Sequence, residues 1–287
     1  MTDDPFSSVF VPVLVELRGV LESLVVIGGW VPELHRRFGG SAHWAVKPLG
    51  TTEVDVLLDV RNGEVGDHRA LAEALALAGF APVMSDGPCA IWERTPEAGE
   101  RIEFFVDHAG PWRGLSTVRA IDPDSRLGAF SLSDLGVLRE YSSVLTVPLE
   151  KADGTVAMAP LRVPELGAFL IHKGATFRRR PDVSKEVKDV HYIVDVMQSG
   201  DTVVEEVAGQ IQEYCSKRES AAELTRSARN NLSVLLGENA NTELRKGLAE
   251  GLSIRHGISE AEADARVRGY LEDFVGLIPE LCGGLRE

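Results

Sequence analysis

The most constraining feature of this sequence is a strand-like segment at residues 51–59 in which acidic and apolar residues alternate. Because successive side chains of a β-strand point to opposite faces, Glu53 and Asp55 share one face, and the apolar residues between them share the face that packs on a core. Two carboxylates placed in this way suit a pair of hard cations, which prefer oxygen ligands. A solvated strand face is the simpler interpretation of the same alternation.

An apolar run that ends in Gly28 and Gly29 precedes this strand. Glycines at the end of a buried strand let the backbone approach a ligand closely. The segment after Trp30 is typical of a helix, with Pro32 in its first turn and acidic residues before basic ones. A helix that begins there offers its amide groups to phosphate. A phosphate-binding turn followed by a carboxylate strand is what nucleoside triphosphate chemistry requires.

Composition limits the class of protein. The chain has 287 residues, a net charge of −14 and three widely spaced cysteines that form no metal motif. General nucleic-acid binding is disfavoured, because it depends on neutralising phosphates with Lys and Arg, although a local basic patch is compatible with the charge. The acidic N-terminal residues, the odd cysteine count and the lack of a long apolar run predict a cytoplasmic protein that does not cross a membrane.

The order of patterns predicts an α/β (α+β) fold in two domains. Residues 1–160 alternate between strand and helix patterns and are expected to form a small mixed sheet with flanking helices. Residues 161–287 have helical spacing of apolar residues almost throughout, and Ser259 followed by Glu262 is a capping box. We expect this second part to be a helical domain.

A third acidic position lies on a later strand pattern, at residues 101–107. Glu103 and Asp107 share one face of that strand and are both candidates for a third metal ligand. Glu103 lies between two apolar residues. The residues themselves leave the choice between these two acids open.

A second polar patch lies in the expected helical domain. Lys173 is flanked by apolar residues in an apolar helix pattern, so its ammonium must reach either an anion or water. Asp189 and Asp195 follow on the next helix pattern, and either could pair with Lys173. The basic run at residues 178–180 is a solvated face or a local footprint for a polyanionic substrate.

Together these motifs resemble the nucleotidyltransferase superfamily, whose pattern is Gly-Gly or Gly-Ser, a spacer, and then acid-apolar-acid. The chain is most similar to the abortive-infection toxin nucleotidyltransferases of the AbiEii type, because Lys173, Ala175 and the pair Lys188–Asp189 match a second pattern of that family. The sequence departs from this pattern in three places, namely Glu53 for the usual Asp, Gly174 for a large apolar residue and Tyr192 for an acid.

The resemblance implies an enzyme that transfers a nucleoside monophosphate from an NTP, such as ATP, to an acceptor hydroxyl. In sequence order, it implies nucleotide contacts from Gly28, Gly29, Trp30 and Lys173, metal ligands Glu53, Asp55 and Glu103 for Mg²⁺ or Mn²⁺, and catalytic roles for Glu53, Asp55, Lys173 and Asp189. It also implies an RNA acceptor such as a tRNA end, and an antitoxin protein as partner.

Three alternatives remain open at this level. The acceptor could be a small molecule, as in the antibiotic nucleotidyltransferases, or a protein. In a different class, the chain could be a degenerate member that binds a nucleotide or a partner without turnover.

Overall fold

The structure is a computed structural model. It describes residues 4, 6–21, 24–40, 44–59, 68–84, 86–94, 100–108, 117–122, 124–150, 154–217, 219–237 and 241–280. Internal contacts divide the chain into two units, Met1–Gly39 with Gly50–Pro164, and Gly40–Leu49 with Glu165–Glu287. The sequence placed the division after residue 160 and kept the segment Gly40–Leu49 in the first domain.

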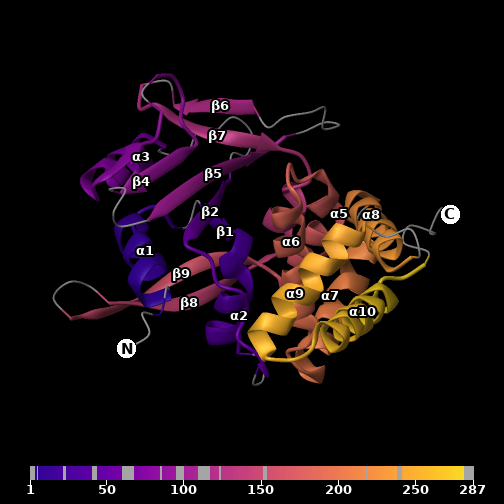
Figure 1. Cartoon of the computed structure of the whole chain (residues 1–287). Coiled ribbons are helices and arrows are strands. Elements are labelled where there is room, and N and C mark those ends of the chain that lie inside the picture. Colours follow the sequence, from indigo (N-terminus) through magenta and orange to yellow (C-terminus); the bar gives the residue numbers. More distant parts are fainter. Residues whose placement is uncertain are drawn as a thin grey trace. The chain divides into compact units, whose positions relative to one another are not determined.

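The first unit is built on a mixed sheet, which has nine strands within the described residues. The pairing order is β3-β4-β5-β2-β1-β9-β8, and β7 joins β5 and pairs with β6 (Figure 1). In sequence order the strands are β1 (Leu24–Ile27), β2 (Glu53–Leu58), β3 (Phe80–Pro82), β4 (Ile91–Arg94), β5 (Arg101–Asp107), β6 (Thr117–Asp122), β7 (Leu127–Leu132), β8 (Ser142–Glu150) and β9 (Val156–Pro164). The expectation of a mixed α/β architecture is confirmed, with a sheet larger than expected.

Strand pairing places β2, which carries Glu53 and Asp55, in the middle of this sheet. β1 runs antiparallel to β2, and β2 runs parallel to β5. Val54, Val56 and Leu58 of β2 are at most 1% exposed, so the apolar face predicted from the alternation is buried. Glu53 and Asp55 lie on the other face and are half-buried.

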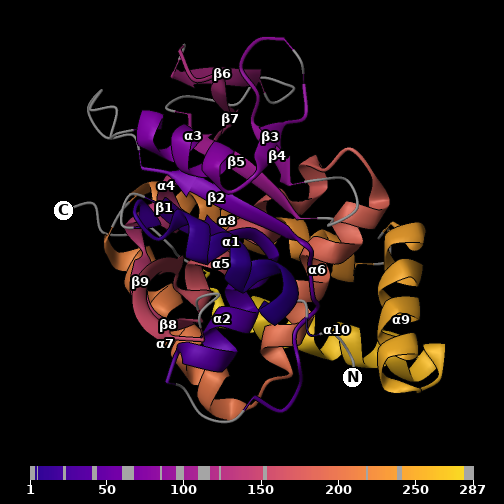
Figure 2. The ribbon, with the colours of Figure 1, turned by 90° about the vertical axis from the view of Figure 1, so that its left-hand side faces the viewer.

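Short helices cover the first unit. They are η1 (Phe6–Phe10), α1 (Val11–Leu17), η3 (Gly28–Trp30), α2 (Val31–Phe38), α3 (His68–Leu77) and α4 (Gly136–Glu140). α1 contacts both α3 and β8, and α2 contacts β8 and β9. Figure 2 shows α1, α2 and α3 together in front of the sheet. Helix α1 ends at Leu17, and Leu21, which follows it, is also buried.

The described part of the second unit consists mainly of helices, with residues 44–49 in irregular structure. Its helices are α5 (Leu166–Thr176), η4 (Phe177–Arg179), α6 (Val183–Met197), α7 (Asp201–Lys217), α8 (Glu219–Leu236), α9 (Thr242–His256) and α10 (Glu260–Leu277). The Ser259 side chain accepts a hydrogen bond from the Glu262 backbone, as the capping-box pattern predicts. No described helix is long and apolar enough to cross a bilayer.

Helix α5 is the centre of this second unit. Its residues from Leu166 to Ala175 are all buried, and it packs against α6, α7 and α8. A Cβ atom built at Gly174 would lie 3.1 Å from the Cβ of Ala228 on α8. The glycine therefore lets α5 and α8 approach closely, which is a physical reason for this departure from the family pattern.

Candidate functional site

The turn after β1 packs directly on the carboxylate of Asp55. Ile27, the last residue of β1, is paired with Asp55, and the chain then turns at Gly28 with φ +76°. A Cβ atom built at Gly28 would lie 1.9 Å from Oδ2 and 2.9 Å from Cβ of Asp55. Glycine is required here both by the backbone conformation and by the neighbouring carboxylate.

Glu103 is the acid that strand pairing brings beside Asp55. In the parallel pair of β2 and β5, Asp55 is opposite Glu103 and Glu53 is opposite Arg101. Paired residues of adjacent strands point to the same face, so Glu53, Asp55 and Glu103 share one face of the sheet. The side chain of Glu103 is 16% exposed.

Asp107, the other candidate for a third acid, binds the start of helix α4 instead. Its carboxylate accepts hydrogen bonds from the backbone amides of Gly136 and Leu135 at the start of that helix, and Arg139 is a nearby positive charge. Burial raises the pKa of Asp107 above its ordinary value, although these hydrogen bonds act in the opposite direction. Asp107 therefore joins β5 to α4, and Glu103 is the acid placed to act with Asp55.

Arg101 introduces a positive charge into the acidic face, the sheet face that carries Glu53, Asp55 and Glu103. Its Nη2 atom lies 2.6 Å from Oε1 of Glu103, and its Nη1 atom lies 3.6 Å from Oε1 of Glu93 on β4. Among the described residues, no group of three or more His, Cys, Asp and Glu side chains is arranged to hold a metal ion. The carboxylate oxygens of Glu53, Asp55 and Glu103 are the correct donors for Mg²⁺ or Mn²⁺ in kind, but Glu103 has a protein cation as its neighbour.

Trp30 positions the acidic strand through its side chain. The indole Nε1 donates a hydrogen bond of 2.9 Å to the backbone carbonyl of Glu53, and the ring is 2% exposed. Its ring centroid lies 4.7 Å from that of Phe10. The indole of Trp30 is thus part of the core of the first unit.

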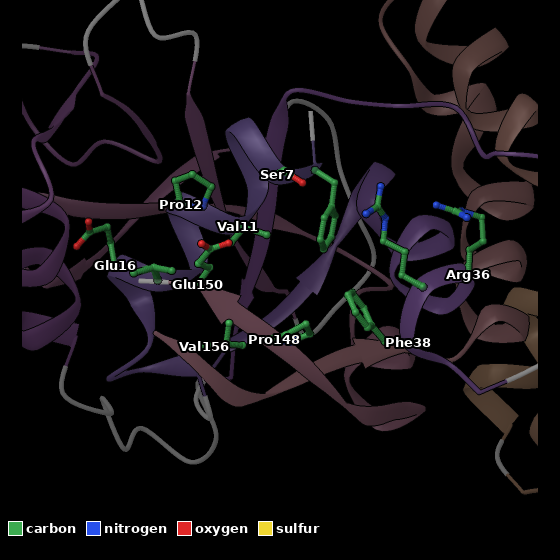
Figure 3. Close-up of a pocket in the computed structure, with 12 residues that line it drawn as sticks. Ser7, Val11, Pro12, Glu16, Arg36, Phe38, Pro148, Glu150 and Val156 are labelled. Carbon is green, nitrogen blue, oxygen red and sulfur yellow. The ribbon is translucent and has the colours of Figure 1, made fainter. Parts of the chain in front are cut away.

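A groove of about 920 Å³ opens elsewhere in the first unit. Figure 3 shows its residues, with Glu16 and Glu150 near one end and Arg36 near the other. Both Arg36 and Arg37 are held by the carboxylate of Glu33. The lining comes from η1, α1, α2, β8 and β9 and does not include the acids of β2 and β5.

The second unit contains the lysine patch, built around a buried ion pair. Lys173 Nζ lies 2.6 Å from Oδ1 of Asp189, and the side chains are 7% and 4% exposed. Arg180 Nε donates a hydrogen bond of 2.5 Å to Oδ2 of the same carboxylate. Burial acts to raise the pKa of Asp189, but the charges of Lys173 and Arg180 outweigh it and hold the pKa below its ordinary value of 3.8.

Of the two candidate acids, Asp189 is the partner of Lys173 in the structure. Asp195 binds other groups. Asp195 accepts hydrogen bonds from the Leu49 backbone at 2.6 Å and from Arg255 at 2.7 Å. Arg255 also donates to the backbone carbonyl of Lys47. Asp195 and Arg255 therefore bind the backbone at Lys47 and Leu49 to α6 and α9 within the second unit.

The basic run after α5 is divided between two environments. Arg178 and Arg179 are exposed, and Arg180 is half-buried against Asp189. Tyr192, which also departs from the pattern that the sequence resembles, is 1% exposed and packs edge-on against Phe169. Both Tyr192 and Gly174 are therefore part of the packing of the second unit.

Because His191 is buried, we expect the stability of the second unit to depend on pH. The ring is 4% exposed, and its Nδ1 atom has no hydrogen-bond partner within the described part of the chain. Burial, followed by the nearby charge of Arg255, lowers the pKa of His191 from 6.5 to about 4. Because the unfolded chain binds this proton more readily, stability is full above pH 6.5 and falls by roughly 3 kcal/mol as the pH approaches 4.

Urea unfolding between pH 4.5 and 7 of wild type and His191→Leu tests this expectation. The variant lacks the titrating ring, so its free energy of unfolding should fall less steeply with decreasing pH than that of wild type. Parallel curves would show that His191 is not the responsible group. Other titrating groups are common to both proteins and cancel in the difference.

Comparison with protein-family models, curated proteins and solved structures found no significant match. The geometry of the chain's own residues therefore carries the functional argument. The structure places Gly28, Glu53, Asp55 and Glu103 in the first unit, and Lys173 and Asp189 in the second.

Sequence reasoning missed Arg101, and it named Arg180 only as part of the basic run at residues 178–180. Arg101 shares a strand face with Glu103, so the alternation along residues 101–107 contained a signal for it. The basic run gave no signal that Arg180 pairs with Asp189. Its contact with Asp189 joins residues in two separate elements, so only the folded chain reveals it.

Proposed function

We propose that the protein is a metal-dependent nucleotidyltransferase, which moves a nucleoside monophosphate from an NTP to an acceptor hydroxyl. The observation that carries the proposal is the packing of the Gly28 turn on Asp55, with a built Cβ 1.9 Å from the carboxylate. This contact places a side-chain-free backbone turn next to a strand carboxylate. Phosphate groups and hard cations are bound by these two kinds of group.

The donor set agrees with a bound Mg²⁺ or Mn²⁺ ion in its chemistry. Glu53 and Asp55 on one strand face, with Glu103 opposite Asp55, would hold the metal through carboxylate oxygens. A metal bound there would lower the pKa of the acceptor hydroxyl and offset charge on the triphosphate. The chain itself would exclude side chains from the turn at Gly28 and Gly29, so that backbone amides can approach the phosphates.

The family resemblance supplies the remaining roles in the proposal. It assigns Lys173 to the triphosphate and Asp189 to the orientation of Lys173, and the contact of 2.6 Å between them supports the second assignment. It also assigns the acceptor to an RNA end such as that of tRNA, with an antitoxin as partner. The exposed Arg178 and Arg179 are the basic residues that such an acceptor would need.

One observation favours a second candidate function. Arg101 lies 2.6 Å from Glu103, so a protein cation already neutralises one of the three proposed ligands. A degenerate member of the superfamily, which binds a nucleotide or a partner protein without metal-dependent turnover, would tolerate this arrangement. A small-molecule acceptor is the enzymatic alternative to RNA.

Calorimetric titration with the four NTPs, with and without Mn²⁺, tests the proposal on wild type and Asp55→Asn. We expect at least one NTP to bind in the presence of metal. Because loss of a group that only hydrogen-bonds to a metal ligand already costs about 10–100-fold in metal affinity, loss of a ligand itself should cost about a hundredfold or more. Asn has the same shape as Asp, so the packing on Gly28 is retained.

Asp86→Asn is the matched control, since it removes the same charge from an exposed position of the first unit. It should bind metal and nucleotide as wild type does. Nucleotide binding that needs no metal and is unchanged in Asp55→Asn would favour the non-catalytic alternative. A metal-dependent NTP complex would instead justify an acceptor screen that begins with tRNA.

A further inference from the structure

The groove of the first unit has a mainly apolar lining that the proposed function does not use. The hairpin of β8 and β9 contributes Pro148, Glu150 and Val156 to it, and η1, α1 and α2 contribute the other lining residues (Figure 3). The groove lies within one unit, so its geometry depends on the fold of that unit alone.

Strand pairing shows that an exposed apolar face of the hairpin continues the groove. Pro148 is paired with Met158 and Glu150 with Val156, and paired residues point to the same face. Val144 lies on this face too, because it is an even number of residues from Pro148. Val144 and Val156 are each 60% exposed and Met158 is 61% exposed. Three large apolar side chains gathered on one exposed face indicate a contact surface.

The charged residues of the groove are separated by sign along its length. Glu16 and Glu150 lie near one end and Arg36 near the other (Figure 3). Arg37 also belongs to the lining, so two acids are balanced by two arginines. Arg36 donates to Glu33 through Nε and Nη2. A guanidinium has five N–H groups, so Arg36 can also donate to a carboxylate of a partner.

We propose that the groove and the hairpin face bind a second copy of this chain about a two-fold axis. Such an axis, placed across the groove, reverses its direction in the partner. The end of each copy that carries Glu16 and Glu150 then meets the Arg36 end of the other. Val144, Val156 and Met158 of both copies form the apolar centre of the contact, and the charged residues form its rim.

Charge favours a second copy over a strongly basic partner as the occupant. The whole chain has a net charge of −14, but the charges that line the groove balance. A basic partner would therefore gain little at this surface, and it would meet the arginines at one end. A second copy carries the same balanced charges in the reverse order, so opposite charges meet at both ends.

The test is the molar mass of the chain in solution, measured by light scattering after gel filtration over a range of protein concentrations. Wild type should approach twice the mass of one chain as its concentration rises. Met158→Glu places a carboxylate at the apolar centre, so the dissociation constant of the dimer should rise by about tenfold or more. Met84→Glu is the matched control, since Met84 is 58% exposed in the same unit and does not line the groove.

A charge reversal tests the direction of the two copies. Glu150→Lys brings a lysine to Arg36 of the other copy, so the dissociation constant should rise by about threefold to tenfold. Glu73→Lys changes the net charge equally at an exposed position of α3. It should not weaken the dimer, because it lies outside the contact.

Chemical cross-linking gives an independent measure of the same direction. In Arg36→Lys, a carbodiimide should join the amine at position 36 to Glu16 or Glu150 of the other copy. A mixture of normal and ¹⁵N-labelled chains distinguishes such products, by mass spectrometry, from those formed within one chain.

Several outcomes would overturn the inference, and all are distinct from failure of the proposed function. A single-chain mass at every concentration excludes the dimer. A dimer that withstands Met158→Glu, or that is lost in Met84→Glu, is formed by another surface. Equal effects of Glu150→Lys and Glu73→Lys exclude the two-fold arrangement. Glu53, Asp55 and Glu103 do not line the groove, so nucleotide binding can fail while the dimer forms, and the reverse.

Discussion

Replacing Asp189 by Asn is expected to destabilise the second unit by about 3–5 kcal/mol, because it removes the carboxylate from a buried ammonium. Lys173 is 7% exposed and Asp189 4% exposed, and their charged atoms lie 2.6 Å apart. The buried Lys173 would then lose the charge that compensates its removal from water, while the shape of the side chain is preserved.

The reverse change should be less severe. In Lys173→Met the carboxylate of Asp189 keeps its hydrogen bond of 2.5 Å from Arg180, so it remains compensated. We therefore expect Lys173→Met to cost clearly less than Asp189→Asn. Urea unfolding at pH 7 measures both free energies. Asp264→Asn, which breaks a half-exposed ion pair with Arg245 in the same unit, should cost about 1 kcal/mol or less.

The pH dependence of this effect follows from the sign of the Asp189 shift. The pKa of Asp189 in the folded protein lies below 3.8, so the stabilisation is complete above pH 3.8 and is lost as the pH falls through the lower folded value. The difference between wild type and Asp189→Asn should thus be constant across neutral pH. Equal costs for Asp189→Asn and Asp264→Asn would show that the buried pair does not stabilise the unit.

Gly28→Ala is expected to weaken metal binding at the acidic face and to destabilise the first unit. The φ angle of +76° costs an alanine about 1–2 kcal/mol. The added Cβ would also lie 1.9 Å from Oδ2 and 2.7 Å from Cγ of Asp55, so the carboxylate must move. Because Asp55 is the proposed ligand, the same displacement should lower the Mn²⁺ affinity by at least about tenfold.

Gly87→Ala separates these two effects. Gly87 has a φ of +74°, and a Cβ built there meets no atom within 4 Å. It therefore carries the backbone strain of Gly28→Ala without the collision with Asp55. We expect Gly87→Ala to lose about 1–2 kcal/mol and to bind Mn²⁺ normally. If the two variants unfold alike and bind Mn²⁺ alike, the turn does not position Asp55.

Much of the local structure was predictable from the sequence. The alternation at residues 51–59 correctly assigned Val54 and Val56 to the buried face, and the capping box at Ser259 marks the start of α10. Such patterns are readable because a strand or a helix repeats with a fixed period, so neighbours in the sequence determine which face each residue occupies. The mixed α/β architecture follows from the order of these patterns.

Choices between candidate partners required the tertiary structure. The register between β2 and β5 places Glu103, not Asp107, beside Asp55. Asp107 instead accepts hydrogen bonds from the backbone amides at the start of α4. Asp189 is the acid that contacts Lys173, whereas Asp195 binds Arg255 and the Leu49 backbone. Each of these contacts joins elements that are separate in the sequence, so no periodic pattern encodes it.

The sequence by itself determined the elements that carry the candidate site, namely a glycine turn, an acidic strand face and a lysine in an apolar helix. Only the tertiary structure decided which charges meet. It placed Arg101 among Glu53, Glu93 and Glu103, and joined Lys173 and Arg180 through Asp189. The physical reason is that strand and helix periodicity acts over a few residues, whereas the energy of an ion pair depends on the distance between charges after folding.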